Sequence, residues 1–172
     1  MPELFSHQEH TRQFIGDNPR TLVLNEPGTG KTASALAAFK DHRDAGGGRC
    51  LVLCPKAIVE PAWVADCRKF TPLLTIAAAY APAANRKQAF GFNTDVVVMN
   101  HDGVKWLLNN ASLLDDFDFL VIDESTAFKN RSAQRSKAVA KLREFFDYRV
   151  LMTGTPMPNG LVDVWHQAFI AD

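Results

Sequence analysis

The segment from Leu22 to Phe39 places the strongest constraint on the fold of this chain. It starts with a short apolar run, continues through a loop with glycines at 28 and 30, and ends in a stretch rich in alanine and leucine. The apolar run predicts a buried β-strand, and the last part predicts a helix that begins at Lys31. A strand that passes through a glycine-rich loop into a helix is typical of α/β domains.

Short apolar runs recur along the chain and alternate with helical stretches. We predict strands at residues 21–24, 50–53, 74–78, 95–99, 119–122 and 149–152. We predict helices at residues 31–42, 58–70, 83–90, 101–109 and 132–146. Runs that are apolar on consecutive residues are expected for strands buried on both faces of a parallel sheet. The alternation therefore predicts an α/β domain with a mostly parallel sheet and right-handed crossovers.

Length and charge narrow the class of protein. A chain of 172 residues suits one domain with a single core, which we assign to residues 1–172. The 19 basic and 19 acidic residues leave no net charge, which argues against a purely electrostatic nucleic-acid binder. A local basic surface is compatible with this balance, and the run from Lys129 to Arg143 has six basic residues and no acid. Such a run is either a solvated helix face or a surface for nucleic acid or a partner domain.

The lack of a targeting signal and the pattern of the cysteines predict a cytoplasmic protein with no membrane partner. No apolar run approaches the roughly 20 residues needed to cross a bilayer, and the N-terminus lacks the pattern of a secretion signal. Cys50, Cys54 and Cys67 lie in or near apolar segments, and no fourth ligand follows at zinc-like spacing. We interpret them as reduced thiols of the core.

The glycine-rich loop has the residues that phosphate binding needs. Glycines let backbone N–H groups curl around phosphate oxygens, and the helix that follows adds the positive end of its dipole. Lys31 is expected to contact the β- and γ-phosphates of ATP, and the hydroxyl of Thr32 to ligate Mg²⁺. The predicted nucleotide-binding residues of this loop are Pro27, Gly28, Thr29, Gly30, Lys31 and Thr32. Asn25 stands where the general pattern has its first glycine.

Two adjacent carboxylates, Asp123 and Glu124, end the apolar run that starts at Phe117. Asp123 can hold Mg²⁺ through its water shell, and Glu124 can activate an attacking water. An Asp-Glu pair after a strand can also simply cap the next helix. Residues 25–30, 123–130 and 153–160 each follow the carboxyl end of a predicted strand, the edge at which open α/β sheets bind ligands. We therefore predict one composite site, with Lys31, Asp123 and Glu124 as its catalytic residues.

Together these motifs resemble the first RecA-like domain of superfamily 2 helicases, especially the Swi/Snf-type ATPases. Residues 25–32 resemble motif I, residues 51–56 with Trp63 and Phe70 resemble motif Ia, and residues 123–126 with Lys129-Asn130 resemble the DEAH box and its trailing residues. Residues 96–101 lie where that family has a strand-end motif. Residues 151–156 with Asn159 and Trp165 resemble motif III. The motifs occur in family order from about residue 4 to residue 167.

The resemblance implies a three-layer RecA-like P-loop NTPase domain and assigns further roles. Gln8 would read the adenine of ATP, as the family's glutamine does. Lys56, Asn100 and His101 would contact the backbone of nucleic acid, and Thr153 and Thr155 would relay the state of the γ-phosphate to the nucleic-acid side. The implied cofactors are ATP and Mg²⁺, and the implied partner is nucleic acid, with double-stranded DNA favoured.

Two departures from the family bear on activity. Thr126 replaces the usual histidine of the DEAH box, which links the ATP site to motif III. The chain stops at Asp172, before the family's second RecA-like domain with its arginine finger. We expect that domain to act in cis or in trans, and we expect weak or no hydrolysis from these residues alone.

The expected function is the ATP-binding half of a helicase or DNA translocase that couples hydrolysis to movement. One alternative is a module of the same fold that binds DNA or a protein without turnover. Another is a P-loop kinase or switch NTPase, against which stand the residues at 151–165.

Overall fold

The computed structural model describes residues 3–154 and 161–172. One sheet of six strands forms the middle of the molecule, in the order β1-β6-β5-β2-β4-β3. The strands are β1 (Arg20–Leu24), β2 (Arg49–Cys54), β3 (Ile76–Ala79), β4 (Val96–Asn100), β5 (Phe117–Asp123) and β6 (Tyr148–Thr153). Each neighbouring pair in this order runs parallel. The predicted α/β class and parallel sheet are therefore confirmed.

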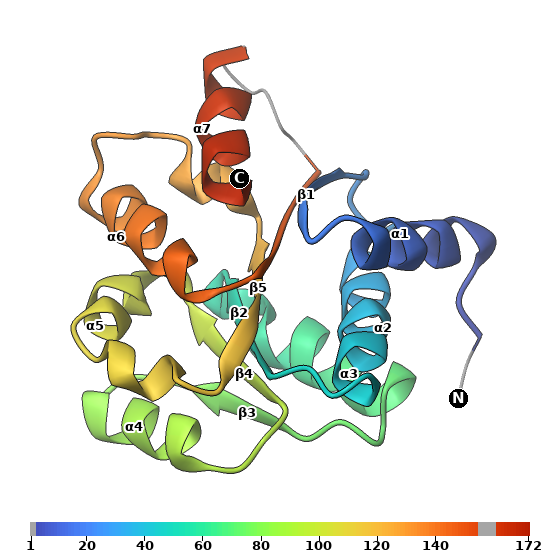
Figure 1. Cartoon of the computed structure of the whole chain (residues 1–172), viewed down its shortest axis with the longest axis horizontal. Helices are drawn as coiled ribbons and strands as arrows, with labels where there is room; N and C mark the ends of the chain where they lie inside the picture. The colour runs from blue at the N-terminus through green and yellow to red at the C-terminus, as the bar shows by residue number, and fades with distance from the viewer. Residues whose placement is uncertain (1–2, 155–160) are drawn as a thin grey trace.

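Helices cover both faces of the sheet and complete three layers (Figure 1). On one face lie α1 (Ser6–Asp17), α2 (Lys31–Asp44) and α3 (Ala65–Phe70). On the other lie α4 (Ala83–Gly91), α5 (Val104–Leu108), α6 (Gln134–Leu142) and α7 (Leu161–Ala171). Parallel strands require crossover connections, and the helices that make these crossovers bury both faces of the sheet.

The side chains of the central strands divide between two hydrophobic clusters. Leu51 and Leu53 of β2 point toward the face covered by α4–α7, whereas Cys50 and Val52 point toward α1–α3. This alternation is the two-residue period of a strand. Because both faces are buried, the strand is apolar from Cys50 to Cys54, which is why the sequence pattern was continuous.

The predicted strands match the structure to about one residue except that β3 begins at Ile76 and not at residue 74, and β5 begins at Phe117 and not at residue 119. The helix predicted at residues 58–70 has three segments: a 3₁₀ turn at Lys56–Ile58, a π-helical segment at Val59–Val64, and α3. Pro61 lies in the π-helical segment, and proline cannot donate the backbone hydrogen bond of a regular α-helix. The helix predicted at 132–146 is α6 followed by a 3₁₀ turn at Arg143–Phe145.

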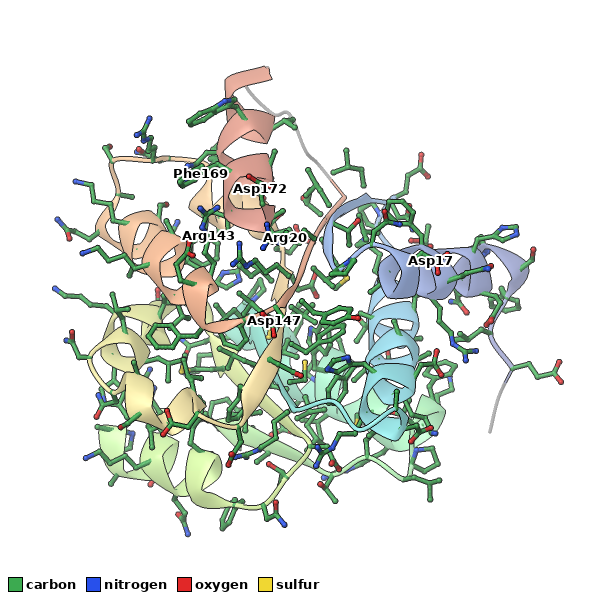
Figure 2. The ribbon with its side chains drawn as sticks, in the orientation of Figure 1. Asp17, Arg20, Arg143, Asp147, Phe169 and Asp172 are labelled. Carbon is green, nitrogen blue, oxygen red and sulfur yellow. The ribbon has the colours of Figure 1, made fainter. Side chains whose placement is uncertain are left out.

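Two helices, α1 and α7, were not predicted from the sequence. The buried residues of α1 are Gln8, Thr11 and Ile15, so its buried face carries little apolar signal. The C-terminal end of α7 is held to the sheet by Arg149, which donates to the backbone oxygen of Asp172 at 2.7 Å. Figure 2 shows Arg20 beside Asp172 at this end, where their charged atoms are 4.0 Å apart.

The three cysteines lie buried in the cluster beneath α2 and α3. Burial raises the pKa of each thiol, because the thiolate loses its hydration there. Their predicted place in the core is confirmed. Across residues 3–154 and 161–172, no helix is long and apolar enough to cross a membrane.

The turn between α2 and β2 contains three consecutive glycines, of which Gly48 is packed against the start of β5. Its N–H donates to the carboxylate of Asp118 at 2.8 Å, and the next N–H, of Arg49, donates to the backbone oxygen of Asp116 at 2.8 Å. A Cβ at Gly48 would lie 2.8 Å from that oxygen. This turn therefore sets where β2 begins to pair with β5.

We expect Gly48→Ala to destabilise the chain by about 1–3 kcal/mol, the usual cost of forcing a methyl group into a packed site. The free energy of unfolding in urea measures this. Gly16→Ala in α1 is the control, because a Cβ there meets nothing within 4 Å. This control should be neutral or stabilising by up to about 1 kcal/mol. Equal effects of the two substitutions would contradict the packing described for Gly48.

Candidate nucleotide-binding site

The glycine-rich loop connects β1 to α2 and curls around the side chain of Lys31. Gly28 and Gly30 have positive φ values of 80° and 76°, which glycine adopts without strain. Lys31 is only 9% exposed, and its ammonium donates to the backbone oxygens of Asn25 at 2.9 Å and Glu26 at 3.0 Å. The loop therefore already has the closed shape and inward-facing cation that phosphate binding requires.

The rest of the predicted loop residues surround this cation. The hydroxyl of Thr29 donates to the backbone oxygen of Glu26 at 2.8 Å, which closes the loop from within. Pro27 is exposed, and Thr32 is half-buried in the first turn of α2. A Cβ at Gly154 would meet the ring of Pro27 at 2.7 Å, so the segment after β6 packs directly on the loop.

Helix α1 packs against the same loop. Gln8 is 6% exposed, and its amide nitrogen donates to the backbone oxygen of Thr29 at 3.2 Å. Its amide oxygen accepts from the N–H of Phe5 at 3.0 Å, and a ring nitrogen of His7 also lies 3.0 Å from the Thr29 oxygen. A Cβ at Gly30 would lie 2.0 Å from the Gln8 amide. Gln8 thus belongs to the site, whereas its contact with adenine stays a prediction.

Asp123 ends the central strand β5 as a buried carboxylate. It is 5% exposed, and its two oxygens accept from the indole N–H of Trp63 at 3.0 Å and from the N–H of Glu124 at 2.9 Å. Burial raises the pKa of Asp123, and these two hydrogen bonds oppose the rise. The charge of Lys31 also lowers this pKa.

Glu124 has a left-handed backbone, with φ 50° and ψ 52°, and is half-buried. Among the described residues it is the non-glycine residue with positive φ. A side chain in this conformation costs free energy, and such strain concentrates at functional sites. The turn therefore changes the direction of the chain directly after Asp123, the last residue of β5.

The pairing of the strands brings the predicted parts together. Leu24 pairs with Thr153, and Met152 pairs with Asp123, so β1, β6 and β5 end at nearly the same level. Thr153 is fully buried between the loop after β1 and the end of β5. Thr155 lies outside the described residues, as do Pro156 and Asn159.

His101 has a different position from the one expected of a nucleic-acid contact. It is 7% exposed, and a ring nitrogen lies 2.9 Å from the backbone oxygen of Asp123. Its ring packs edge-on against Phe128, with the centroids 4.8 Å apart. Burial lowers the pKa of His101, which favours the neutral ring. His101 therefore joins the ends of β4 and β5 and does not present a cation to solvent.

The other predicted nucleic-acid contacts remain accessible. Lys56 is exposed directly after β2. Asn100 is half-buried at the end of β4, between Arg86 at 3.5 Å and Asp102 at 3.4 Å. Thr126, which replaces the family histidine, is half-buried in the 3₁₀ turn Ser125–Phe128.

Two functional contacts were missed by the sequence reasoning. Trp63 was noted only as part of a resemblance, yet it holds the Asp123 carboxylate. Ser125, next to Glu124, donates to the side-chain oxygen of Gln167 at 2.5 Å, and both residues are fully buried. The partners are 60 and 42 residues apart along the chain, so no local pattern could have revealed them.

Comparison with known proteins places the chain in a family. The model of the SNF2-related domain matches residues 8–170, so this chain belongs to the SNF2-related family. A protein of Acyrthosiphon pisum secondary endosymbiont phage 1 is 31% identical over 169 residues, covering 91% of this chain and 36% of the relative. An uncharacterised ATP-dependent helicase of Mycoplasma genitalium is 27% identical over 154 residues, covering 84% of this chain and 14% of the relative.

Solved structures confirm the RecA-like fold. The Sulfolobus solfataricus SWI2/SNF2 ATPase core in complex with double-stranded DNA superposes with a TM-score of 0.84 at 24% identity. The match covers 98% of this chain and 36% of that chain. The present chain therefore spans between about a seventh and about a third of these relatives.

The hydrogen bond from Trp63 to Asp123 generates a prediction on stability and pH. Trp63→Phe removes the N–H donor and leaves a buried carboxylate oxygen unpaired, at a cost of about 1–3 kcal/mol beyond the lost packing. The bond favours the charged carboxylate, so its loss raises the pKa of Asp123 further. The added cost is present above that pKa and disappears as the pH falls through it, because the protonated acid needs no such donor.

The measurement is the free energy of unfolding of wild type and variant at neutral and acid pH. Trp106→Phe is the control, since its indole lies under Arg86 and its substitution removes no partner of Asp123. We expect the cost of Trp63→Phe to shrink as the solution becomes acid, and that of Trp106→Phe to stay constant. A pH-independent difference for Trp63→Phe would contradict the assigned hydrogen bond.

Proposed function

We propose that this domain binds ATP with Mg²⁺ and is the nucleotide-binding half of a DNA-dependent ATPase that moves along double-stranded DNA. The observation that carries the proposal is the closed glycine loop around Lys31 after β1, at the same sheet edge where Asp123 ends β5 on the other side of β6. Membership of the SNF2-related family supports the same reading. The helicase and DNA-complex descriptions of its relatives agree with it.

The loop suits a triphosphate for a simple electrostatic reason. Among the described residues the Lys31 ammonium bonds to two backbone carbonyls, which are neutral acceptors, so phosphate oxygens would compete for it favourably. A Cβ at Gly28 would meet nothing within 4 Å, so the backbone there is open to close approach by a phosphate. We assign phosphate binding to Gly28, Thr29, Gly30, Lys31 and Thr32.

The acid pair suits a hydrated magnesium ion and an attacking water. Each Asp123 oxygen accepts one hydrogen bond and keeps a second lone pair, which can face a metal-bound water. We assign Mg²⁺ to Thr32 and Asp123. The ion would neutralise charge that develops on the phosphates. We assign to Glu124 the acceptance of a proton from water, since it is half-buried beside Asp123 and holds a strained turn.

Hydrolysis at a useful rate would need an arginine from a second RecA-like domain, in cis or in trans. Such a residue contributes roughly 10³-fold or more in P-loop enzymes. Thr153 lies between the loop and the end of β5, where it can transmit the state of the γ-phosphate to the rest of the sheet edge. Lys56 and Asn100 are our candidates for backbone contacts with DNA.

Two variants of this chain test nucleotide binding. Lys31→Ala removes a charge-assisted contact worth about 1.5–3 kcal/mol, so we expect a loss of roughly tenfold or more in affinity for a fluorescent ATP analogue with Mg²⁺. Glu124→Gln is the matched control at the same site. It preserves size and hydrogen bonding, so binding should persist while DNA-stimulated hydrolysis by the two-domain enzyme is lost.

Unchanged affinity of Lys31→Ala would refute the phosphate-loop assignment. Hydrolysis by Glu124→Gln within a factor of about two of wild type would refute the role of the carboxylate while leaving nucleotide binding intact. Binding with no DNA-stimulated turnover in the two-domain enzyme would favour a module that binds without catalysis.

The DNA contact generates a separate prediction. Affinity of this chain for duplex DNA should be weak and independent of sequence, with a salt slope of roughly 2 to 4, because only a few cations contact phosphates. Lys56→Ala should lower the affinity equally for unrelated sequences and reduce the slope by about one unit. Fluorescence anisotropy at several salt concentrations measures both quantities.

Lys40→Ala is the charge-matched control, because Lys40 pairs with Asp44 on α2 and not at the sheet edge of the site. It should leave the slope unchanged. If Lys56→Ala had no effect on affinity or slope, Lys56 would be an ordinary surface residue. Strong discrimination between sequences would contradict a protein that tracks the DNA backbone.

A further inference from the structure

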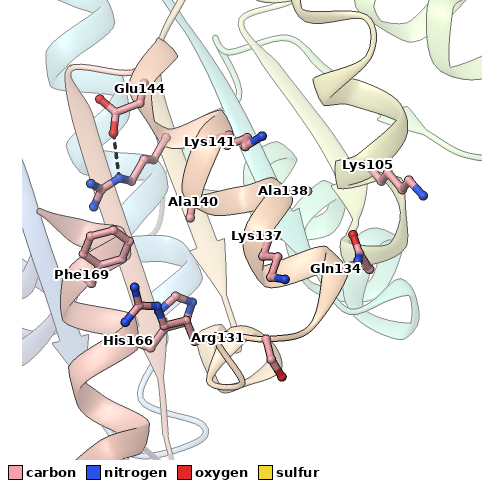
Figure 3. Close-up of a pocket in the computed structure, with 12 residues that line it drawn as sticks. Lys105, Arg131, Gln134, Lys137, Ala138, Ala140, Lys141, Glu144, His166 and Phe169 are labelled. Atoms are coloured by element: carbon pink, nitrogen blue, oxygen red, sulfur yellow. Dashed lines mark hydrogen bonds and ion pairs between the residues drawn. The ribbon is translucent and has the colours of Figure 1, made fainter.

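A basic cavity of about 810 Å³ lies between α5, α6 and α7, away from the phosphate loop (Figure 3). Within the described part of the chain its lining holds five cations, namely Lys105, Arg131, Lys137, Lys141 and Arg143. Its acidic lining residue, Glu144, accepts from Arg143 at 2.9 Å. The proposed nucleotide site uses none of these residues.

Two of the lining cations lie on α6, which contains no acidic residue. Lys137 and Lys141 are four residues apart on this helix, so they share one face, and both are exposed. Like charges at this spacing destabilise a helix, and a bound anion would remove the penalty. The groove therefore favours a ligand that carries several negative charges.

The opposite wall, on α7, is aromatic. The guanidinium of Arg143 lies 4.1 Å from the ring centroid of Phe169, and that of Arg131 lies 5.5 Å from the ring of Trp165. Phe169 lines the cavity and is 38% exposed, and Trp165, outside the lining, stacks on it with the ring centroids 5.9 Å apart. The groove thus presents apolar area beside its charges, so its complement has both features.

His166 supplies a second, independent sign of a ligand. It lines the cavity, is 2% exposed, and has no hydrogen-bond partner at either ring nitrogen within residues 3–154 and 161–172. One buried nitrogen of Arg143 is also unpartnered there. Buried polar groups are normally satisfied, so an unpaired imidazole beside a cavity indicates a partner group that enters it.

We propose that this groove docks an acidic segment of a partner protein. Its carboxylates would pair with the α6 lysines and accept from His166, and an apolar side chain would pack on Phe169. Duplex DNA fits less well, because backbone recognition uses cations and amides and has no use for an aromatic wall. The proposed DNA contact at Lys56 also lies after β2, beside the helices of the other sheet face.

Helix α7 connects the groove to the acidic loop of the proposed active site, the segment that contains Asp123, Glu124 and Ser125. Gln167 follows His166 on α7 and accepts from Ser125, the neighbour of Glu124. A segment docked against α7 would therefore contact the same helix that holds this loop.

The test uses this chain and a fluorescent short peptide that alternates glutamate with other residues around a central phenylalanine. We expect it to bind, and we expect a version with glutamine in place of glutamate to bind at least tenfold more weakly. Lys137→Glu combined with Lys141→Glu should lower the affinity for the acidic peptide at least tenfold. Lys87→Glu on α4 is the control, because it reverses an exposed charge outside the groove and should have little effect.

Two further measurements separate docking from general charge attraction. Phe169→Ala should lower the affinity for the peptide severalfold without changing the charge of the groove. The ring signals of His166 in NMR spectra should shift when the peptide binds. No binding of the peptide, or equal binding of its glutamine version, would overturn the proposal. If duplex DNA bound more tightly than the peptide, and Lys137→Glu with Lys141→Glu abolished that binding, the groove would be a nucleic-acid surface and the proposal would be overturned. Neither result depends on nucleotide binding.

Discussion

Parallel pairing of all six strands is the constraint on which the rest of this structure depends. Since every strand runs in the same direction, the segments after β1, β2, β4, β5 and β6 all emerge at one edge of the sheet. Each return crossing is a helix or irregular segment, so no hairpin interrupts that edge. Residues that are far apart along the chain, such as Lys31 and Asp123, are thereby brought within electrostatic range. A ligand at this edge can contact several strands at once.

The buried carboxylate of Asp123 shows how the interior supports this edge. A lone charge in a core is costly, and here Trp63 from the segment after β2 and the N–H of Glu124 reduce the cost. His101 binds the carbonyl of the same residue from β4. Two hydrogen bonds thus hold the carboxylate and a third holds the backbone of the same residue, so the position of Asp123 is defined before any ligand binds. The strained turn at Glu124 is supported by the same packing.

Helix α7 connects two features that otherwise lie apart. On one side Gln167 bonds to Ser125 beneath the acidic loop, and on the other His166 and Phe169 line the basic groove. Its end is held to β6 and β1 through Arg149 and Asp172. The helix is therefore held at two points, by Gln167 at Ser125 and by Asp172 at Arg149.

The sequence by itself determined the fold class, most of the strands and the family, because these depend on local periodicity and on short motifs such as the glycine loop at residues 25–30. It also indicated that the loop and Asp123 share an edge, since the carboxyl ends of parallel strands do so. Only the tertiary structure decided that His101 is buried, that Trp63 holds Asp123, and that α6 and α7 enclose a groove. Those contacts depend on how helices cross the sheet. A local pattern shows that a residue is buried, but it does not say which distant residue it will meet.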